Sequence, residues 1–308
     1  MPSTKLNEEI KTILITGGTG LVGTTLSRML HEKGYTVTHL SRSPYSKTYK
    51  TFRWDVKGGE IDEEAITSAD AIMHLAGAGV ADKRWSDSWK REIYNSRIDS
   101  TRLLREKVYT LNSELKFFLS ASAIGYYGWD SGEELMDEES KQGQGFLADV
   151  VKDWEAEVHK FDELGIPNGL VRIGIVLSEQ GGALTEMAKP IKYGIGAPLG
   201  SGKQFMSWIH LEDLCGIFIY MLENSICETI NAVAPTPVRN AEFTKQVAKQ
   251  LNRPLWLPNV PKFALKLIIG EMADILVGGN RVSSKKIESR GFKFQFPTLD
   301  KALEDLLQ

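Results

Sequence analysis

The segment from Thr16 to Gly23, TGGTGLVG, has the residue types and spacing of a turn that holds a pyrophosphate. Gly18, Gly20 and Gly23 satisfy the pattern G-x-G-x-x-G, and an apolar run before the turn and a helical pattern after it supply the expected strand and helix. Glycines let the backbone approach the anion, and the helix N-terminus directs N–H groups at it. The contacting residues that we expect in this turn are Gly17, Thr19, Gly20, Leu21 and Val22.

The end of the second strand indicates which dinucleotide binds. Folds that select NAD place an acidic residue there, about 20 residues past the glycine turn, to hold the ribose 2′-hydroxyl. Here the strand 36–40 is followed by Ser41-Arg42-Ser43, without a carboxylate. Arg42 can pair with a 2′-phosphate and stack on adenine, and Ser41 can donate a hydrogen bond. This pattern favours NADP(H) over NAD(H); the alternative is that Arg42 is a solvated surface residue.

The elements that must position these residues alternate between short apolar strands and helices. Such alternation predicts an α/β fold, a Rossmann-type doubly wound parallel sheet with helices on both faces. The expected strands are 12–16, 36–40, 71–75, 116–120 and 169–176, and the expected helices of this part are 21–32, 89–107 and 146–164.

The last third of the chain predicts a smaller lobe that is mostly helical. We expect a Rossmann domain over residues 1–180, completed by about 205–234, and a substrate-side lobe from 181–204 and 235–308. Residues 181–202 are rich in glycine and proline and predict a loop over the cleft, whereas 263–279 predict a helix. Lys189, Lys203 and Gln204 could hold an anionic substrate there or lie in solvent, and the sequence leaves both open.

Composition restricts the classes of partner and compartment. The formal net charge of −3 argues against a nucleic acid partner. Cys215 and Cys227 give neither a disulfide framework nor metal-ligand spacing, so we expect two buried thiols in a reducing compartment. The polar first residues and the shortness of the longest apolar run, 263–269, predict a cytoplasmic protein without a membrane partner.

Several longer segments carry a resemblance to a known family. They are RWSDSWKREIYNSRIDST (84–101), SASAIGYYG, GFLADVVKDWE, VRIGIVLSEQGGAL, PLGSGKQFMSWIHLEDL and VPKFALKLIIGEMADILVGGNRVSSKKIESRGF. With them, the chain from about Lys11 to Leu307 resembles the atypical extended short-chain dehydrogenase/reductases. Within these it is similar to the epimerase family proteins of the NAD(P)-dependent epimerase/dehydratase class, which carry their own C-terminal domain of unknown function.

The resemblance implies further residues that contact the cofactor. Asp55, in Trp54-Asp55-Val56, corresponds to an aspartate that contacts the adenine amino group, although capping of its own loop is an equal alternative. The small-residue loop after the next strand implies Leu75, Ala76 and Gly77, while His74 is expected to pack in the strand end. The remaining implied positions are Glu92, Arg97 and Val176, for which a charged helix face or core packing are the alternatives.

The catalytic residues typical of short-chain dehydrogenases are only partly present, as in the branch that this chain resembles. Ser122 aligns with the serine that holds a substrate oxygen, with hydrogen bonding at the strand end as the alternative. The expected Tyr-x-x-x-Lys pair falls on Leu147 and Val151, which cannot transfer a proton, and Lys152 lies about 100° away around the helix. Tyr126 is then the first candidate for a proton donor, with packing against the second lobe as its alternative.

Two functions of different classes therefore remain. The first is an NADP(H)-dependent oxidoreductase or epimerase-like enzyme that acts on an unknown small polar molecule as a monomer or homodimer. The second is a non-catalytic NADP(H)-binding sensor or regulator. Asp149 and His210 are weaker catalytic candidates, since a solvated carboxylate and a structural histidine bonded to the backbone are the favoured interpretations. No metal site is expected.

Overall fold

The computed structural model describes residues 10–43, 48–112 and 114–307. Its centre is an eight-stranded sheet in the order β12-β8-β6-β5-β1-β2-β3-β4, in which only the pair β3–β4 is antiparallel. The strands are β1 (Thr12–Thr16), β2 (Thr36–Ser41), β3 (Lys50–Asp55), β4 (Glu60–Ile61), β5 (Ala71–His74), β6 (Phe117–Ala123), β8 (Asn168–Ile173) and β12 (Thr229–Ala232). The parallel sheet confirms the predicted α/β class.

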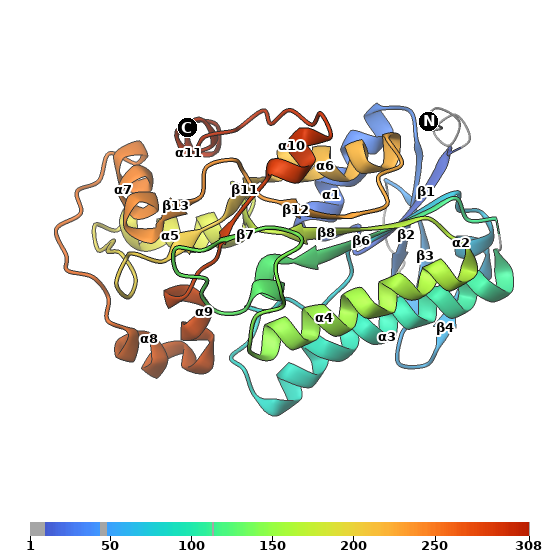
Figure 1. Ribbon diagram of the computed structural model, residues 1–308, viewed down its shortest axis with the longest axis horizontal. Helices are drawn as coiled ribbons and strands as arrows, with labels where there is room; N and C mark the ends of the chain where they lie inside the picture. Colours follow the sequence, from blue (N-terminus) through green and yellow to red (C-terminus); the bar gives the residue numbers. More distant parts are fainter. Residues whose placement is uncertain (1–9, 44–47, 113, 308) are drawn as a thin grey trace.

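Helices cover both faces of this sheet (Figure 1). Helices α1 (Leu21–Glu32) and α6 (Leu211–Glu223) pack together on one face, and α3 (Asp87–Leu111) and α4 (Phe146–His159) pack together on the other. The short helices α2 (Glu63–Thr67), η1 (Ile124–Tyr127) and η2 (Lys160–Leu164) complete this part. The result is the three-layer arrangement of a Rossmann-type fold.

The central strands are apolar because helices cover both of their sides. Ile13, Leu14 and Ile15 in β1 are completely buried, as are Phe118 and Leu119 in β6. Continuous apolar runs of this kind are typical of strands in buried parallel sheets. The same burial explains why the sequence shows these strands as unbroken apolar segments.

The strand order reverses between β1 and β5. The chain passes from β1 to β2 and β3 on one side, and then crosses to β5, β6 and β8 on the other. In open α/β sheets such a reversal leaves a crevice at the carboxyl ends of the two strands, and ligands bind there. Thr16 and His74, the paired last residues of β1 and β5, therefore mark the place where the fold offers a ligand site.

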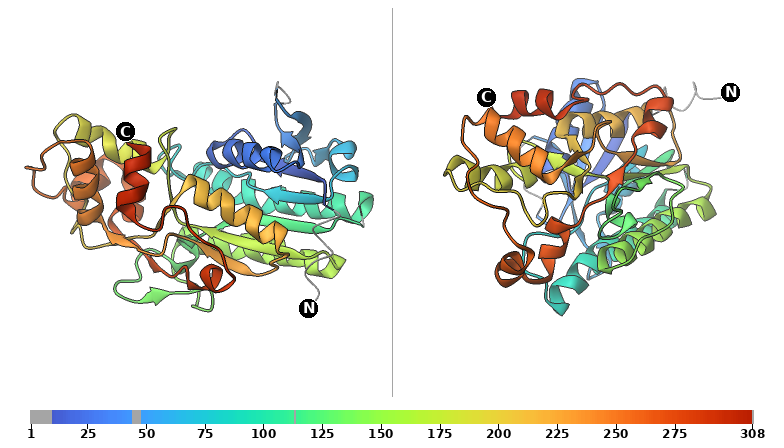
Figure 2. Two further views of the ribbon diagram at one scale, coloured as in Figure 1. Left: turned by 90° about the horizontal axis from the view of Figure 1, so that it is seen from above. Right: turned by 60° about the vertical axis from the view of Figure 1, so that its left-hand side comes forward.

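The C-terminal third adds helices and small two-stranded sheets at one end of the molecule (Figure 2). The strand pairs are β9 (Ile175–Leu177) with β11 (Trp208–His210), β10 (Phe205–Met206) with β13 (Val238–Arg239), and β7 (Leu135–Met136) with β14 (Arg281–Val282). The helices are α5 (Ala183–Lys192), α7 (Asn240–Gln250), α8 (Lys262–Ile269), η3 (Gly270–Met272), α9 (Ala273–Val277), α10 (Lys285–Ser289) and α11 (Leu299–Leu306).

Four predictions about residues 169–279 were wrong. The single helix expected over 263–279 is divided into α8, η3 and α9, and Gly270, with φ of +66°, ends α8. Residues 183–192 of the expected loop form helix α5, with Pro190 inside it. The expected strand 169–176 is two strands, β8 and β9, interrupted at Gly174, where a Cβ atom would lie 2.5 Å from the Ser207 carbonyl oxygen. Cys227 is exposed, whereas Cys215 is buried as expected. No helix among the described residues has the length and apolar character needed to cross a membrane.

Candidate functional site

The glycine turn connects β1 to α1 at the crevice. Gly17 has φ of +71°, a left-handed conformation that glycine adopts without strain, and its carbonyl accepts the N–H of Gly20 at 3.0 Å. Gly20 is the N-cap residue of α1, and among the described residues no side chain caps this helix N-terminus and no acidic residue lies in its first turn. The end of the helix therefore presents N–H groups and a positive dipole to an anion.

Close packing fixes the shape of this turn. A Cβ atom on Gly23 would lie 2.2 Å from the carbonyl oxygen of Gly17, so the helix can approach the strand only with glycine at this position. A Cβ atom on Gly18 would lie 2.6 Å from the imidazole of His39, which the Ser27 hydroxyl holds at 2.8 Å. The glycines of the predicted pattern thus serve the helix–strand contact as well as anion approach.

The loop after β5 is anchored to the end of β1 through Thr16. The Thr16 hydroxyl accepts the backbone N–H groups of Leu75 and Ala76, each at 3.1 Å, and therefore donates to Nδ1 of His74 at 2.7 Å. Nε2 of His74 lies 3.1 Å from the Ser100 hydroxyl, which assigns the proton to Nε2. Burial, with a smaller contribution from the charge of Arg97, lowers the pKa of His74 to about 3. His74 is a neutral, fully buried packing residue, as predicted.

Arg97 lies directly behind this loop. Its Nη1 donates to the carbonyl oxygens of Ala78 and Ile93 at 3.0 and 2.9 Å, and a Cβ atom on Gly77 would lie 3.1 Å from its Cζ. Burial lowers the pKa of Arg97 to about 10, and none of the ion pairs among the described residues includes it. A mostly buried guanidinium with carbonyl partners and no carboxylate partner fits a phosphate ligand.

Lys57, in the loop after β3, contacts both Asp55 and Glu92. The carboxylate of Asp55 accepts the backbone N–H groups of Lys57 and Gly58 at 3.0 and 3.2 Å, and the side-chain amine of Lys57 pairs with Glu92 at 3.2 Å. The loop-capping alternative for Asp55 is therefore present in the structure. Both of these backbone bonds go to Oδ1, so the second carboxylate oxygen of the exposed Asp55 takes no part in capping the loop.

Two arginines lie near the end of β2, Arg42 directly after it and Arg53 on the neighbouring strand β3. Ser41 is the last residue of β2, its hydroxyl accepts the N–H of Ser43 at 3.2 Å, and the neighbouring Arg42 is exposed. The parallel register sets Ser41 beside Arg53 of β3, and Arg53 is exposed as well. Arg53 is not predicted from the sequence, because its place beside Ser41 follows only from the pairing of β2 with β3.

Ser122 and Tyr126 meet a buried ionic network at the end of β6. The Ser122 hydroxyl donates to Glu155 at 2.5 Å, and Glu155 forms two 2.8 Å hydrogen bonds with the Arg172 guanidinium. Arg172 also donates to the phenol oxygen of Tyr127 at 3.0 Å. The Arg172 guanidinium lies 3.5 Å from the centre of the Tyr126 ring.

The Ser122 hydroxyl is therefore bonded to Glu155, and Ser122 is only 2% exposed. This is the alternative role that the sequence left open, hydrogen bonding at the strand end. The half-buried Tyr126 ring stacks on the cation of Arg172 and meets the ring of Tyr127 edge-on at 5.5 Å. Burial raises the pKa of Tyr127 to about 12, which makes Tyr127 a poor acid compared with an ordinary phenol.

The positions of the usual Tyr–Lys pair are apolar in space as well as in sequence. A Cβ atom on Gly125 would lie 3.6 Å from Cβ of Leu147 and 3.9 Å from a methyl group of Val151. Both side chains therefore contact the turn that follows β6, where a tyrosine and a lysine would stand in an ordinary short-chain dehydrogenase. Neither can exchange a proton there.

The remaining candidate residues outside the glycine-rich segment are Val176, His210 and Asp149. Val176 is a half-buried residue of β9, where it pairs with Ile209 of β11. His210 is structural, as predicted: Nδ1 accepts the N–H of Glu212 at 3.1 Å and Nε2 faces Asp305 at 3.2 Å. Asp149 is exposed and accepts a hydrogen bond from Gln142.

Of the glycine-rich segment, Lys189 pairs with Glu186 and the side chain of Lys203 is exposed. The amide of Gln204 donates to the carbonyl oxygens of Leu199 and Leu276, each at 3.0 Å. Gln204 thus ties the segment to the C-terminal helices instead of facing a cleft.

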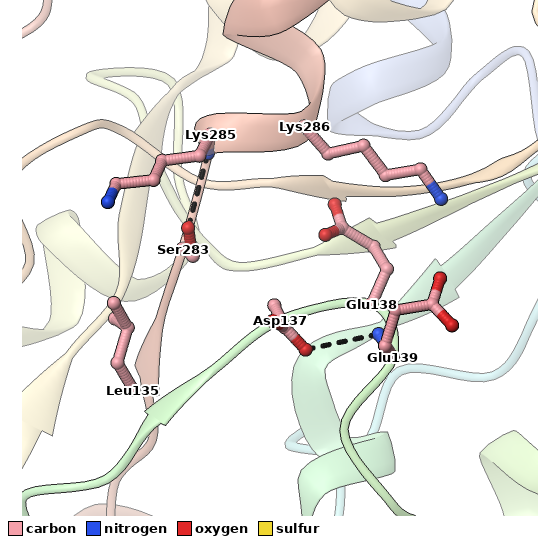
Figure 3. Close-up of a pocket in the computed structure, with 7 residues that line it drawn as sticks. All are labelled: Leu135, Asp137, Glu138, Glu139, Ser283, Lys285 and Lys286. Atoms are coloured by element: carbon pink, nitrogen blue, oxygen red, sulfur yellow. Dashed lines mark hydrogen bonds between the residues drawn. The ribbon is translucent and has the colours of Figure 1, made fainter.

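Two surface pockets lie outside the glycine turn. One, of about 320 Å³, lies between the residues that follow β7 and the start of α10. There the Lys286 side chain lies on the side of Glu138 and Glu139, whereas the Lys285 side chain points away from them, toward Leu135 (Figure 3). The other, of about 380 Å³, is lined by Trp129 and Asp130 and by α8 and α9. Among the described residues, no group of three or more His, Cys, Asp or Glu is arranged to hold a metal ion.

Comparisons with known sequences identify the family profiles and relatives that this chain matches. The profile of the NAD dependent epimerase/dehydratase family matches residues 13–232, and that of a domain of unknown function (DUF1731) matches residues 260–306. An epimerase family protein of Mycobacterium leprae is 34% identical over 293 residues, 94% of each chain. One of Staphylococcus aureus is 35% identical over 304 residues, 97% of this chain and 99% of that protein.

Solved structures with the same fold include two at 30% identity or more. The crystal structure of human epimerase family protein SDR39U1 (isoform 2) with NADPH is 31% identical, covers 96% of this chain and 99% of that chain, and has a TM-score of 0.85. The structure of a nucleoside-diphosphate sugar epimerase from Corynebacterium glutamicum is 30% identical and has a TM-score of 0.80. The match covers 97% of this chain and 58% of that chain. The chain belongs to the NAD dependent epimerase/dehydratase family, in the branch of the epimerase family proteins.

Proposed function

We propose that this protein binds NADP(H) at the glycine turn and is an oxidoreductase or epimerase-like enzyme acting on a small polar molecule. The observation that carries the cofactor assignment is the end of β2, where Ser41 and Arg42 stand in place of an acidic residue and Arg53 lies alongside. An acidic side chain there would repel a 2′-phosphate, whereas two guanidinium groups attract it. The NADPH in the structure of the human relative supports the same assignment.

The residues of the crevice fit the rest of the dinucleotide. The uncapped N-terminus of α1 would face the pyrophosphate, and the buried cation of Arg97 would add a positive charge behind the loop that Leu75, Ala76 and Gly77 form. Asp55 would face the adenine, and Glu92 and Val176 would line the remaining length of the site. When bound, a nicotinamide cofactor supplies hydride transfer.

For the acid–base group we propose Tyr126. Its phenol is the proton-transfer group beside the network of Ser122, Glu155 and Arg172, and this network fixes the ring through the 3.5 Å cation–π contact. Ser122 would then act on the substrate side through the same network and not by itself, because Glu155 holds its hydroxyl. Proton transfer requires hydrogen-bond reach to the substrate, and the half-buried position of Tyr126 permits it.

A non-catalytic sensor remains the second candidate. The observation that favours it is the apolar contact of Leu147 and Val151 with Gly125, at the place where the usual catalytic pair would stand. A sensor requires the dinucleotide site and a surface that responds to its occupancy, but no proton donor.

The cofactor assignment is tested by titrating the full chain with NADPH and with NADH and following the nicotinamide fluorescence. We expect NADPH to bind more tightly, and Arg42→Ala to lower NADPH affinity about tenfold or more while NADH affinity stays near its original value, since a lost charge-assisted bond is worth about 1.5–3 kcal/mol. Arg28→Ala is the matched control, because that exposed arginine pairs with Glu32 on α1. Equal affinities of the unmodified chain for the two dinucleotides would reject the proposal.

A further inference from the structure

Helix α8 exposes an apolar face at the end of the C-terminal lobe. None of the residues of α8 is buried, and the side chains of Phe263, Leu267 and Ile268 are 69%, 77% and 72% exposed. At 100° per residue these three positions span about 140° of the helix, and Lys262 and Lys266 stand beside them. We call Phe263, Leu267 and Ile268 the α8 face. Its width and exposure indicate a contact surface, because a helix of a monomeric protein normally turns such a stripe inward.

The lobe that carries this face has a charge opposite to that of the whole chain. Residues 181–204 and 235–308 together contain fifteen lysines and arginines against eight aspartates and glutamates, a formal charge of +7, while the full chain carries −3. Lys262 and Lys266 share one carboxylate, that of Asp274, at 2.8 and 3.4 Å, so a positive charge remains beside the α8 face. The complementary partner is therefore anionic.

The same lobe exposes two aromatic side chains of the type that prefers the membrane interface. Trp256 is 68% exposed and its indole N–H donates to the carbonyl oxygen of Gly194, while the adjacent Tyr193 is 82% exposed. Rings of this kind have an apolar body and a polar end, and they are enriched where an apolar phase meets water.

We propose that the α8 face docks on an anionic phospholipid surface, with the helix lying in the plane of the interface. Phe263, Leu267 and Ile268 enter the boundary of the acyl chains, and Lys262 and Lys266 stay at the level of the headgroups. This revises the expectation of no membrane partner, which rested on the length of apolar runs. A peripheral contact needs no spanning segment.

A second copy of the chain fits this face less well. A symmetric dimer through α8 would place the same surface of both subunits in contact, and so bring two lobes of charge +7 together. Like charges at close range oppose such a contact, whereas an anionic surface attracts the same residues.

The test is co-sedimentation of the full chain with vesicles of phosphatidylcholine alone and of phosphatidylcholine mixed with phosphatidylglycerol. We expect binding to the mixed vesicles, decreasing as salt is raised, and little binding to phosphatidylcholine alone. The variant Leu267→Ser/Ile268→Ser is expected to lower the partition coefficient at least about tenfold, because each lost side chain removes apolar area from the acyl boundary. Tyr109→Ser, an equally exposed position on α3 (70%), is the matched control.

Several outcomes would overturn the proposal: no binding to either vesicle, equal binding to both, or equal binding by the double variant and the unmodified chain. A dimer detected by light scattering that dissociates in the double variant would assign the face to a second copy instead. Thermal unfolding and NADPH titration of each variant verify that the fold and the dinucleotide site are intact. The lipid result is therefore independent of the proposed cofactor.

Discussion

At the scale of single residues, the pair of Glu155 and Arg172 holds the candidate catalytic region together. Their side chains are 7% and 5% exposed, and the two hydrogen bonds between them are each 2.8 Å. The Ser122 hydroxyl donates a further hydrogen bond to Glu155, and Arg172 donates one to the phenol oxygen of Tyr127. The Tyr126 ring packs on the Arg172 guanidinium. A buried pair of this kind tolerates loss of one partner poorly, because the other charge is left without compensation.

We therefore expect Glu155→Gln to lower the free energy of unfolding by about 3–5 kcal/mol. The measurement is urea denaturation, and Glu32→Gln is the control, since the exposed pair of Glu32 with Arg28 is worth less than about 1 kcal/mol. Similar losses in the two variants would show that the buried pair does not support the fold. A large loss in Glu155→Gln alone agrees with the network described.

The sequence predicted where the candidate catalytic residues lie, but not which residues they contact. Ser122 and Tyr126 lie at the end of β6, as the motif SASAIGYYG indicates. The contact of Ser122 with Glu155 joins residues 33 positions apart, and that of Tyr127 with Arg172 joins residues 45 apart. Such contacts depend on how β6, α4 and β8 pack, and no local pattern encodes that packing.

At the scale of elements, the glycine turn is both a contact between β1 and α1 and the proposed cofactor site. Its shape depends on Gly23, whose missing Cβ atom leaves room for the Gly17 carbonyl. A substitution in this turn therefore changes the backbone geometry of the β1–α1 connection, even when no ligand is bound.

Gly23→Ala is expected to abolish measurable NADPH binding and to destabilise the protein, because a Cβ atom 2.2 Å from the Gly17 oxygen forces α1 away from β1. Gly216→Ala in α6 is the matched helical control, since its Cβ would meet the Phe292 ring at an ordinary 3.4 Å. We expect that control to be neutral or to gain about 0.5–1 kcal/mol from helix propensity. Dinucleotide fluorescence and thermal unfolding give the two readouts, and full binding by Gly23→Ala would contradict the turn geometry.

Periodicity predicted most elements of the Rossmann part but failed at α5. Strands such as β1 and β5 are continuous apolar runs, and such runs need no tertiary information to recognise. Residues 183–192 look like a loop, because glycine precedes them and Pro190 lies within them. The helix forms nevertheless, since burial of Leu184, Ala188 and Ile191 to 3% exposure or less outweighs a weak intrinsic propensity.

At the scale of the whole molecule, buried neutral histidines make stability depend on pH. The imidazole of His74 bridges Thr16 and Ser100 between β1, β5 and α3, and burial also lowers the pKa values of His39 and His210. A histidine with a lowered pKa binds its proton more readily in the unfolded chain. Its contribution to stability is therefore present above about pH 6.5 and is lost as the pH falls toward the folded value.

For His74, with a folded pKa of about 3, lowering the pH from 7 to 5 is expected to reduce the free energy of unfolding by about 2 kcal/mol. Urea denaturation at the two pH values measures this difference. In His74→Asn the drop between the two pH values is expected to be smaller by about the same amount, whatever the stability of the variant at pH 7. An identical drop in both proteins would show that His74 is not the neutral group described.

The position of the dinucleotide in the crevice determines which residues hold it, and a crystal structure of the chain with NADPH measures this position directly. We predict the pyrophosphate against the first turn of α1, the 2′-phosphate within hydrogen-bonding distance of Ser41 and Arg42, and the nicotinamide on the side of Tyr126. A 2′-phosphate out of reach of Arg42, or a dinucleotide bound away from the turn from Thr16 to Gly23, would contradict the account.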